Sequence, residues 1–218
     1  MAHVLFDVNG TLLDPRALTA GFEGAPGGLG LSVLDQAVAQ SMVDTMTGQF
    51  RPFLEYVRGA LAHRAALMGA GADAVEQGTE AAKALPPYPD ADDALSRLRV
   101  AGHTPCAVTN SATDGARSAL EAAGLLAHFH AVIGADAVGA YKPDPRVYGH
   151  ALEVLGIEPG ETWFVAGHWW DVAGAKRAGM RTAWIARDEA VLLDTTPEPD
   201  VQAPDLARAA EAIARAEG

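Results

Sequence analysis

Short apolar runs alternate with helical segments along most of the chain, and this alternation limits the possible folds more than any other feature of the sequence. Strands that alternate with helices are typical of a parallel sheet with helices on both faces. The predicted strands are residues 2–8, 104–109, 129–133, 162–166 and 182–185; the predicted helices between or after them are residues 90–101, 113–123, 145–155, 171–178 and 203–217, with a loop at 190–204. We therefore expect an α/β fold with a Rossmann-like, doubly wound parallel sheet.

The segment between the first and second predicted strands contains only helical patterns, with apolar residues at a three-to-four spacing. A Gly- and Pro-rich stretch, residues 21–30, precedes these patterns and is expected to be a flexible loop or hinge. The predicted helices of this segment are residues 31–47, 51–68 and 72–84. The expected domains are a core of residues 1–14 and 89–218 and an inserted helical cap of residues 15–88.

Charge and cysteine content argue against several classes of function. The formal net charge is −12, whereas nucleic acids are bound through basic surfaces. Cys106 is the single cysteine, so no intrachain disulfide can form, which fits a reducing compartment. No apolar run approaches the roughly 20 residues that cross a bilayer, and the N-terminal segment lacks a basic leader. We expect a cytoplasmic protein with no nucleic-acid partner and no membrane partner.

The first predicted strand delivers a carboxylate to its end. An apolar run stops at Asp7, and the turn dipeptide Asn9-Gly10 and then Thr11 follow. A charged side chain is rarely buried without a partner, and open α/β sheets bind ligands beyond the carboxyl ends of their strands. Asp7 is thus either a covalent nucleophile or a residue that caps a turn.

Three later segments also place polar side chains after predicted strands. They are Thr109-Asn110-Ser111, Tyr141-Lys142-Pro143-Asp144 and Gly167-His168-Trp169-Trp170-Asp171. Because the carboxyl ends of parallel strands share one edge of the sheet, we expect Asp7, Asn110, Lys142 and Asp171 to converge on one crevice.

Each of these residues also has a purely structural interpretation when it is taken alone. Asn110 and Ser111 could cap the helix that follows them, and Asp171 could be an N-cap. Lys142 could be a solvated surface charge, and His168 could be a structural histidine. The four tryptophans are more often core or interface residues than site residues.

Residues 6–12, Phe-Asp-Val-Asn-Gly-Thr-Leu, resemble the first motif of the haloacid dehalogenase superfamily. Residues 109–111, Lys142 and Asp171 are similar to its second, third and fourth motifs, in the same order. The resemblance covers nearly the whole chain and implies that Asp7 is the nucleophile. It also implies that Lys142 steadies the Asp7 carboxylate and offsets developing charge.

The phosphatases of this superfamily carry an acid/base Asp two residues after the nucleophile and a second acidic residue in the fourth motif, which help to hold Mg²⁺. This chain has Asn9 at the first position and Gly167 at the second. Asn9 cannot donate a proton to an alcohol leaving group, and losing such help typically costs about 10²–10⁴-fold in rate. We therefore expect a metal-independent site without a cofactor.

The resemblance is stronger to the 2-haloacid dehalogenases, whose tyrosine in the third-motif region matches Tyr148. It implies that Asp7 attacks C2 of a small halogenated carboxylate, that halide leaves, and that water then hydrolyses the Asp7 ester to release a 2-hydroxy acid. The expected catalytic residues are Asp7, Lys142 and Asp171, with Asp171 activating the water. The expected substrate-binding residues are Thr11, Thr109, Asn110, Ser111, Tyr148, His168 and Trp169.

One departure concerns the halide. Those dehalogenases carry an Arg early in the cap that helps to receive the halide, but here no Lys or Arg occurs between Arg16 and Arg51, and the matching part of the first cap helix is Val33-Leu34-Asp35. The halide would then be held by Asn110, by His168 or by the Trp169 indole N–H, or it would not be held at all. A compact set of donors could suit fluoride, which leads to the hypothesis that fluoroacetate is a substrate.

Two other functions remain open from the sequence alone. The chain could be a phosphatase-type hydrolase of the same superfamily, or a non-catalytic protein that binds a small carboxylate. Related dehalogenases are often homodimers, and the apolar cap helices could form such a contact.

Overall fold

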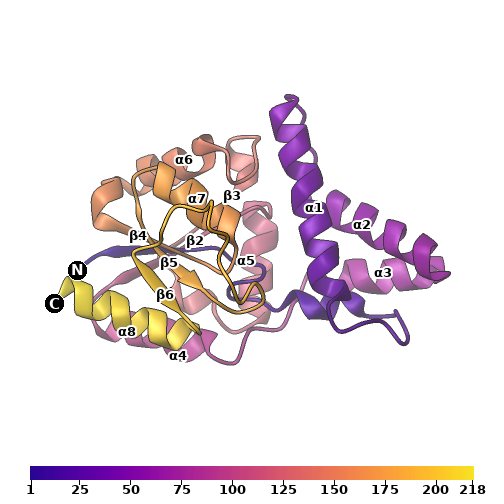
Figure 1. Ribbon diagram of the computed structural model, residues 1–218, viewed down its shortest axis with the longest axis horizontal. Helices are drawn as coiled ribbons and strands as arrows, with labels where there is room; N and C mark the ends of the chain where they lie inside the picture. Colours follow the sequence, from indigo (N-terminus) through magenta and orange to yellow (C-terminus); the bar gives the residue numbers. More distant parts are fainter.

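A parallel sheet of six strands forms the core, in the spatial order β3-β2-β1-β4-β5-β6 (Figure 1). The computed structural model describes residues 1–218. The strands are β1 (His3–Phe6), β2 (Thr104–Thr109), β3 (Ala131–Gly134), β4 (Thr162–Ala166), β5 (Arg181–Ile185) and β6 (Val201–Ala203). Every neighbouring pair is parallel, which confirms the predicted doubly wound α/β fold.

Both faces of the sheet are covered by helices. Successive side chains of each strand point to opposite faces, so each face of the sheet presents apolar side chains that must be covered. In β1, Val4 and Phe6 belong to one apolar cluster, whereas Leu5 belongs to the other. The first cluster includes residues of α4 (Ala91–Val100), α5 (Thr113–Ala122) and α8 (Leu206–Glu217), and the second includes residues of α6 (Pro145–Leu155) and α7 (Trp169–Arg177). The strands are therefore buried on both faces, as a central parallel sheet requires.

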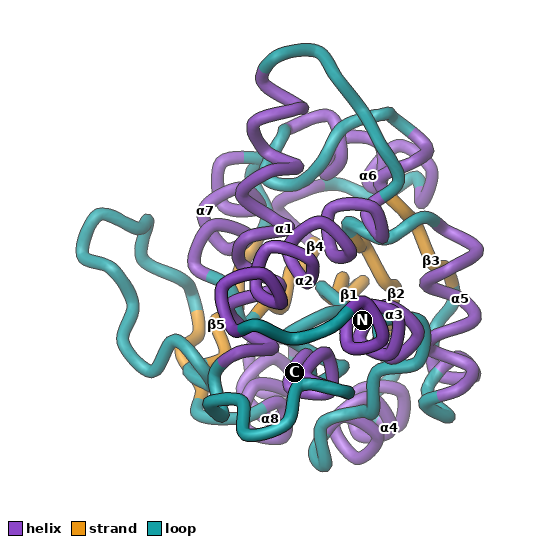
Figure 2. Tube along the Cα trace, turned by 90° about the vertical axis from the view of Figure 1, so that its right-hand side faces the viewer, coloured by secondary structure: helices purple, strands orange, loops and turns teal.

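Three helices between β1 and α4 pack together beside the sheet: α1 (Leu29–Met46), α2 (Phe53–Met68) and α3 (Ala72–Ala81). Figure 1 shows them at the right of the molecule, and in Figure 2, where that side faces the viewer, they lie in front of the strands. The two views together place these helices beyond the carboxyl ends of the strands. We call α1, α2 and α3 the cap helices.

The chain enters and leaves the cap helices through two segments that lie side by side. The Asp14 N–H donates to the carbonyl of Pro86 at 2.8 Å, and the Tyr88 N–H donates to the carbonyl of Leu12 at 2.9 Å. This pairing lies near the expected domain boundaries, although the division into residues 15–88 and the remainder stays a prediction.

Two segments expected to be irregular contain regular structure. A short 3₁₀ helix spans Pro15–Thr19, and α1 begins at Leu29, inside the Gly-rich stretch. The expected loop at 190–204 includes β6, and residue 203, the expected start of the last helix, is the end of this strand. The last helix begins at Leu206. The three-residue strand β6 is formed by its pairing with β5. Such a pairing leaves no pattern in the local sequence, so it could not be predicted.

The predicted burial of two tryptophans agrees with the structure. Trp163 and Trp184 are core residues, and Cys106 is a buried free thiol in β2. None of the helices has the length and apolar character needed to cross a membrane.

Candidate active site

Asp7 follows β1 directly and is held by contacts from three separate segments of the chain. Its N–H donates to the carbonyl of Val165 in β4 at 3.0 Å, which continues the strand pairing. The Thr11 hydroxyl donates to Oδ2 at 2.8 Å, and the Lys142 ammonium donates to Oδ1 at 2.8 Å. Thr11 in turn accepts from the N–H of Gly167 at 2.9 Å. Both carboxylate oxygens are thus oriented, and the residue is only 4% exposed.

The turn after Asp7 requires a glycine for two reasons. Gly10 has φ +85°, a conformation that other residues rarely adopt. A Cβ at this position would also lie 2.4 Å from Nε2 of His168. The Asn9-Gly10 turn seen in the sequence therefore brings the backbone against the histidine of a distant segment.

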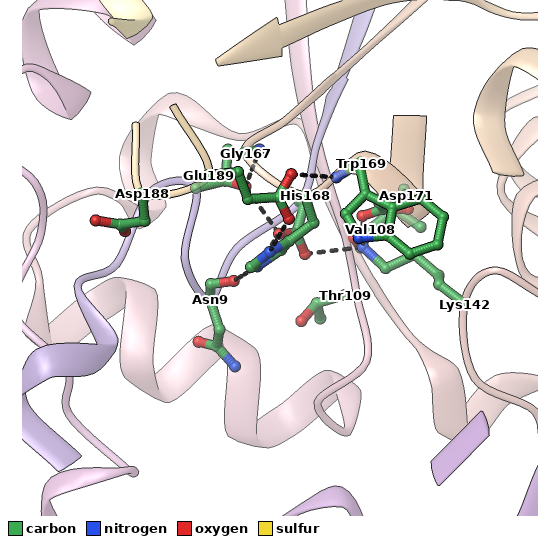
Figure 3. A network of polar contacts seen from close by, with 12 residues as sticks. Asn9, Val108, Thr109, Lys142, Gly167, His168, Trp169, Asp171, Asp188 and Glu189 are labelled. Carbon is green, nitrogen blue, oxygen red and sulfur yellow. Dashed lines mark hydrogen bonds and ion pairs between the residues drawn. The ribbon is translucent and has the colours of Figure 1, made fainter. Parts of the chain in front are cut away.

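Lys142 is completely buried and contacts two carboxylates, of which that of Asp171 is labelled in Figure 3. Its Nζ donates to Asp7 Oδ1 at 2.8 Å, to Asp171 Oδ2 at 2.6 Å and to the carbonyl of Val108 at 2.9 Å. Burial would lower the pKa of Lys142, but the charges of Asp171 and Asp7 outweigh burial and raise it. The interpretation of Lys142 as a solvated surface charge is therefore wrong.

Asp171 lies in the first turn of α7 and is also fully buried. Its Oδ1 accepts a hydrogen bond from the Tyr148 hydroxyl at 2.6 Å, while Oδ2 accepts from Lys142. Burial raises the pKa of Asp171 to about 6; Lys142 opposes this shift, and the charge of Asp7 adds to it. His168 occupies the N-cap position of α7, so the interpretation of Asp171 as an N-cap is wrong.

The two carboxylates that share Lys142 have opposite pKa shifts. Burial would raise the pKa of Asp7, but the charges of Lys142 and His168 and the hydrogen bonds from Lys142 and Thr11 outweigh burial and lower it. Asp7 is therefore ionised at neutral pH, whereas the pKa of Asp171 is raised to about 6. A pair of titratable groups with separated pKa values is typical of a site that divides nucleophile and base roles.

Asn110 supplies the second-motif amide. Its Oδ1 accepts from the backbone N–H of Lys142 at 2.8 Å, while its Nδ2 is buried without a hydrogen-bond partner. The expected alternative, a cap on α5, is wrong: the N-cap position is Ala112, and the Thr113 N–H donates to Asp136 at 2.9 Å. Asn110 thus holds the backbone at Lys142 through its Oδ1, while its Nδ2 amide group has no hydrogen-bond partner.

The residues on either side of Asn110 make contacts with the backbone and with the turn after Asp7. Thr109 Oγ1 accepts from the N–H of Ser111 at 3.2 Å, and the Ser111 hydroxyl accepts from Nδ2 of Asn9 at 3.2 Å. Ser111 therefore ties the end of β2 to the loop after β1.

His168 lies near Oδ2 of Asp7, whereas Lys142 contacts Oδ1. Its Nε2 is 3.1 Å from the carbonyl of Asn9 and 3.9 Å from Oδ2 of Asp7, and its Nδ1 is 3.7 Å from Oε1 of Glu189. Burial lowers the pKa of His168, but Glu189, Asp7 and the Asn9 carbonyl outweigh it and raise the pKa to about 9. His168 is therefore a cation at neutral pH.

The comparisons with known proteins agree with this geometry. The family model for haloacid dehalogenase-like hydrolases matches residues 1–179. The chain belongs to this family. It is 33% identical over 190 residues to the (S)-2-haloacid dehalogenase of Xanthobacter autotrophicus, which covers 84% of this chain and 74% of that protein.

Other members of the family cover both branches considered above. The structure of the L-2-haloacid dehalogenase from Xanthobacter autotrophicus with chloropropionic acid covalently bound superposes with a TM-score of 0.87, at 27% identity and 98% coverage of each chain. The phosphoserine phosphatase of Thermus thermophilus is 37% identical over 165 residues, which is 71% of this chain and 63% of that protein.

Glu189 is a site residue that the sequence analysis missed. It follows β5, and its Oε2 accepts from the backbone N–H of Trp169 at 2.8 Å while Oε1 faces His168 (Figure 3). It belongs to no motif and no periodic segment, so no signal in the sequence could have identified it. Trp169 itself is 40% exposed, and its side chain lies outside the hydrogen-bond network that joins Asp7, Lys142 and Asp171.

Asp35 of α1 lies on the same side of the site as His168. Burial raises the pKa of Asp35; the charge of His168 opposes this shift, and Glu189 and Asp188 add to it. These residues line a cavity of about 620 Å³ beside the turn at Gly10. In this cavity the cation near Asp7 is therefore His168 of the fourth motif. The cap helix α1 contributes Asp35 to the cavity rather than a cation.

Metal ligands are not gathered around Asp7. No group of three His, Cys, Asp or Glu side chains in the chain is arranged to hold a metal ion. The two carboxylates that could anchor Mg²⁺ instead share the ammonium of Lys142.

Proposed function

We propose that the chain hydrolyses the carbon–halogen bond of a small 2-haloacid through an ester of Asp7 and releases a 2-hydroxy acid. The observation that carries this proposal is the buried bridge from Asp7 through Lys142 to Asp171. It combines an ionised nucleophile with a second carboxylate whose pKa is about 6. The similarity to (S)-2-haloacid dehalogenases supports the same reaction.

In the first step, a carboxylate oxygen of Asp7 attacks C2 from the side opposite the halogen. The oxygen–carbon bond forms as the carbon–halogen bond breaks, and the halide takes the bonding electrons. A halide anion needs no proton, so Asn9 can stand where a phosphatase needs an acid. The free Nδ2 of Asn110 is the donor available to the halide, and the His168 cation offsets the charge of the substrate carboxylate.

In the second step, water attacks the carbonyl carbon of the Asp7 ester. Asp171 takes the proton of this water, and a base with a pKa near the working pH is well matched to that role. Lys142 contacts Oδ1 of the free carboxylate and Thr11 contacts Oδ2. The donor on the oxygen that remains the ester carbonyl stabilises the oxyanion of the tetrahedral intermediate. Collapse breaks the bond between the Asp7 carbonyl carbon and the ester oxygen, and that oxygen takes the proton from Asp171 as the 2-hydroxy acid leaves. The Asp7 carboxyl group then loses its remaining proton to solvent, which restores the carboxylate.

The reaction is proposed to be independent of metal ions and cofactors. The carboxylates of Asp7 and Asp171 both contact the ammonium of Lys142, and the second acidic residue of the fourth motif is replaced by Gly167. An ammonium between two carboxylates supplies the positive charge that a divalent ion supplies elsewhere.

The phosphatase alternative draws support from the phosphoserine phosphatase relative, and the non-catalytic alternative from the missing cap arginine. The experiment that separates the three functions measures halide release from (S)-2-chloropropanoate with and without a chelator, for the wild type and for Asp7→Asn. We expect release that is insensitive to the chelator and absent in Asp7→Asn. Chelator-sensitive phosphate release, or unchanged substrate affinity without turnover, would support the other functions.

The domain division, the homodimer and the cytoplasmic location are part of the same proposal. The exposed side chains of Val43, Met46 and Phe50 lie at and just beyond the end of α1, which supports an apolar contact through the cap helices. Light scattering coupled to size-exclusion chromatography tests the homodimer, since a mass of one chain would exclude it. Fractionation of the native cells tests the location.

A further inference from the structure

A cavity of about 450 Å³ lies between the cap helices and α5. One wall consists of bulky side chains, among them Leu34 of α1 and Phe53 and Val57 of α2. The facing wall consists of small residues, among them Gly115 and Ala116 of α5. Large residues on one side and small residues on the other leave a mostly apolar space that no part of this chain fills.

The polar end of this cavity lies at the turn that follows the nucleophile. Asn9 and Ser111, whose side chains contact each other, line it, and they are the close chain neighbours of Asp7 and Asn110. Lys83 is the single charged residue of the lining, and its ammonium pairs outside with Glu80 while its side chain is about half exposed. A second carboxylate or a phosphate would therefore find no free cation in the cavity.

We propose that this cavity binds an apolar substituent of several carbon atoms on C2 of the substrate. The proposal rests on the proposed function, because it places C2 at Asp7. Cavities of about 300–1,000 Å³ hold ligands of drug size, which far exceeds the space that a haloacetate or a halopropanoate needs. The substrates of highest kcat/KM are then 2-haloacids with long alkyl groups.

Gly115→Leu tests the proposal with little risk to folding. A Cβ at Gly115 would have no atom within 4 Å, and leucine is a better helix former than glycine. Gly149→Leu in α6 is the matched control, because its Cβ would also have no atom within 4 Å and Gly149 does not line the cavity.

The assay is bromide release from 2-bromopropanoate, 2-bromobutanoate, 2-bromohexanoate and 2-bromooctanoate. In the wild type, kcat/KM is expected to rise about fourfold with each added methylene until the cavity is filled, the change that corresponds to burying one methylene group. Gly115→Leu should remove most of the gain for 2-bromooctanoate and spare 2-bromopropanoate. Gly149→Leu should behave as the wild type.

The outcomes separate this proposal from the proposed function. If 2-bromopropanoate is hydrolysed and longer acids are no better, the cavity proposal is wrong and the function stands. If no acid releases bromide, the function is wrong, and calorimetric titration with 2-hydroxyoctanoate decides on the cavity. Binding to the wild type and to Gly149→Leu but not to Gly115→Leu would support the cavity proposal, whereas no binding to the wild type would overturn it.

Discussion

Replacing Lys142 with methionine should destabilise the folded state by about 3–5 kcal/mol, the usual consequence of removing one partner of a buried ion pair. Methionine has a similar length, so the change removes charge more than volume. Asp7 Oδ1, Asp171 Oδ2 and the carbonyl of Val108 would each lose the donor that lies 2.6–2.9 Å away in the wild type. All three positions are buried, so water cannot replace the ammonium at little cost.

The loss should depend on pH in a defined direction. Without Lys142, the pKa of Asp171, which is already raised to about 6, should rise further because the opposing charge is gone. A group with a raised pKa binds its proton more tightly in the folded state, so protonation stabilises the fold as the pH falls through that pKa. The destabilisation by Lys142→Met should therefore be larger at pH 8 than at pH 5.

Urea unfolding of Lys142→Met, Asp171→Asn and the double variant measures this coupling. Asp171→Asn removes one of the two buried carboxylates that lose their partner in Lys142→Met. The double variant should therefore be more stable than the sum of the single losses predicts, by roughly 1–3 kcal/mol. Lys176→Met is the control: its ammonium pairs with Asp200 at 2.6 Å where both side chains are about one-third exposed, and it should change stability by less than about 1 kcal/mol. Additive losses, or a Lys142 effect no larger than the Lys176 effect, would refute the reasoning.

Three further predictions concern activity and the site. The kcat/KM of the free enzyme should rise with pH through about 6 as Asp171 loses its proton, and fall through about 9 as His168 loses its proton; a flat profile between pH 5 and 10 would contradict both roles. Glu189→Gln should lower the pKa of His168 and move the alkaline limb to lower pH, with the acid limb unchanged as the internal control; an unmoved alkaline limb would show that Glu189 does not sustain the cation. Fluoroacetate should release fluoride, measured with an ion-selective electrode, and release of chloride from chloroacetate without any fluoride would end the fluoride hypothesis.

The fold and the central site could be predicted because both follow from local patterns and one topological rule. Apolar runs define the strands, and parallel strands bring their carboxyl ends to one edge. Asp7, Asn110 and Lys142 therefore converge although they are far apart in the chain, and Asp171 joins them from the start of α7.

The parts that could not be predicted depend on contacts between distant segments. The pairing of β6 with β5 and the contact of Glu189 with His168 have no counterpart in local composition. The protonation of His168 is a further example, since an isolated histidine carries no information about which carboxylate will face it. The sequence also could not show whether the Asn110 side chain caps α5 or accepts from the backbone N–H of Lys142, because an asparagine suits both roles.

The most direct test of the account is the fate of solvent oxygen. The enzyme is allowed many turnovers of (S)-2-chloropropanoate in H₂¹⁸O, and the peptide that contains Asp7 is then examined by mass spectrometry. Hydrolysis of an Asp7 ester at its carbonyl carbon predicts ¹⁸O in the Asp7 carboxylate. Label in the 2-hydroxy acid with none in Asp7 would mean that water attacks C2 directly, and it would contradict the proposed mechanism.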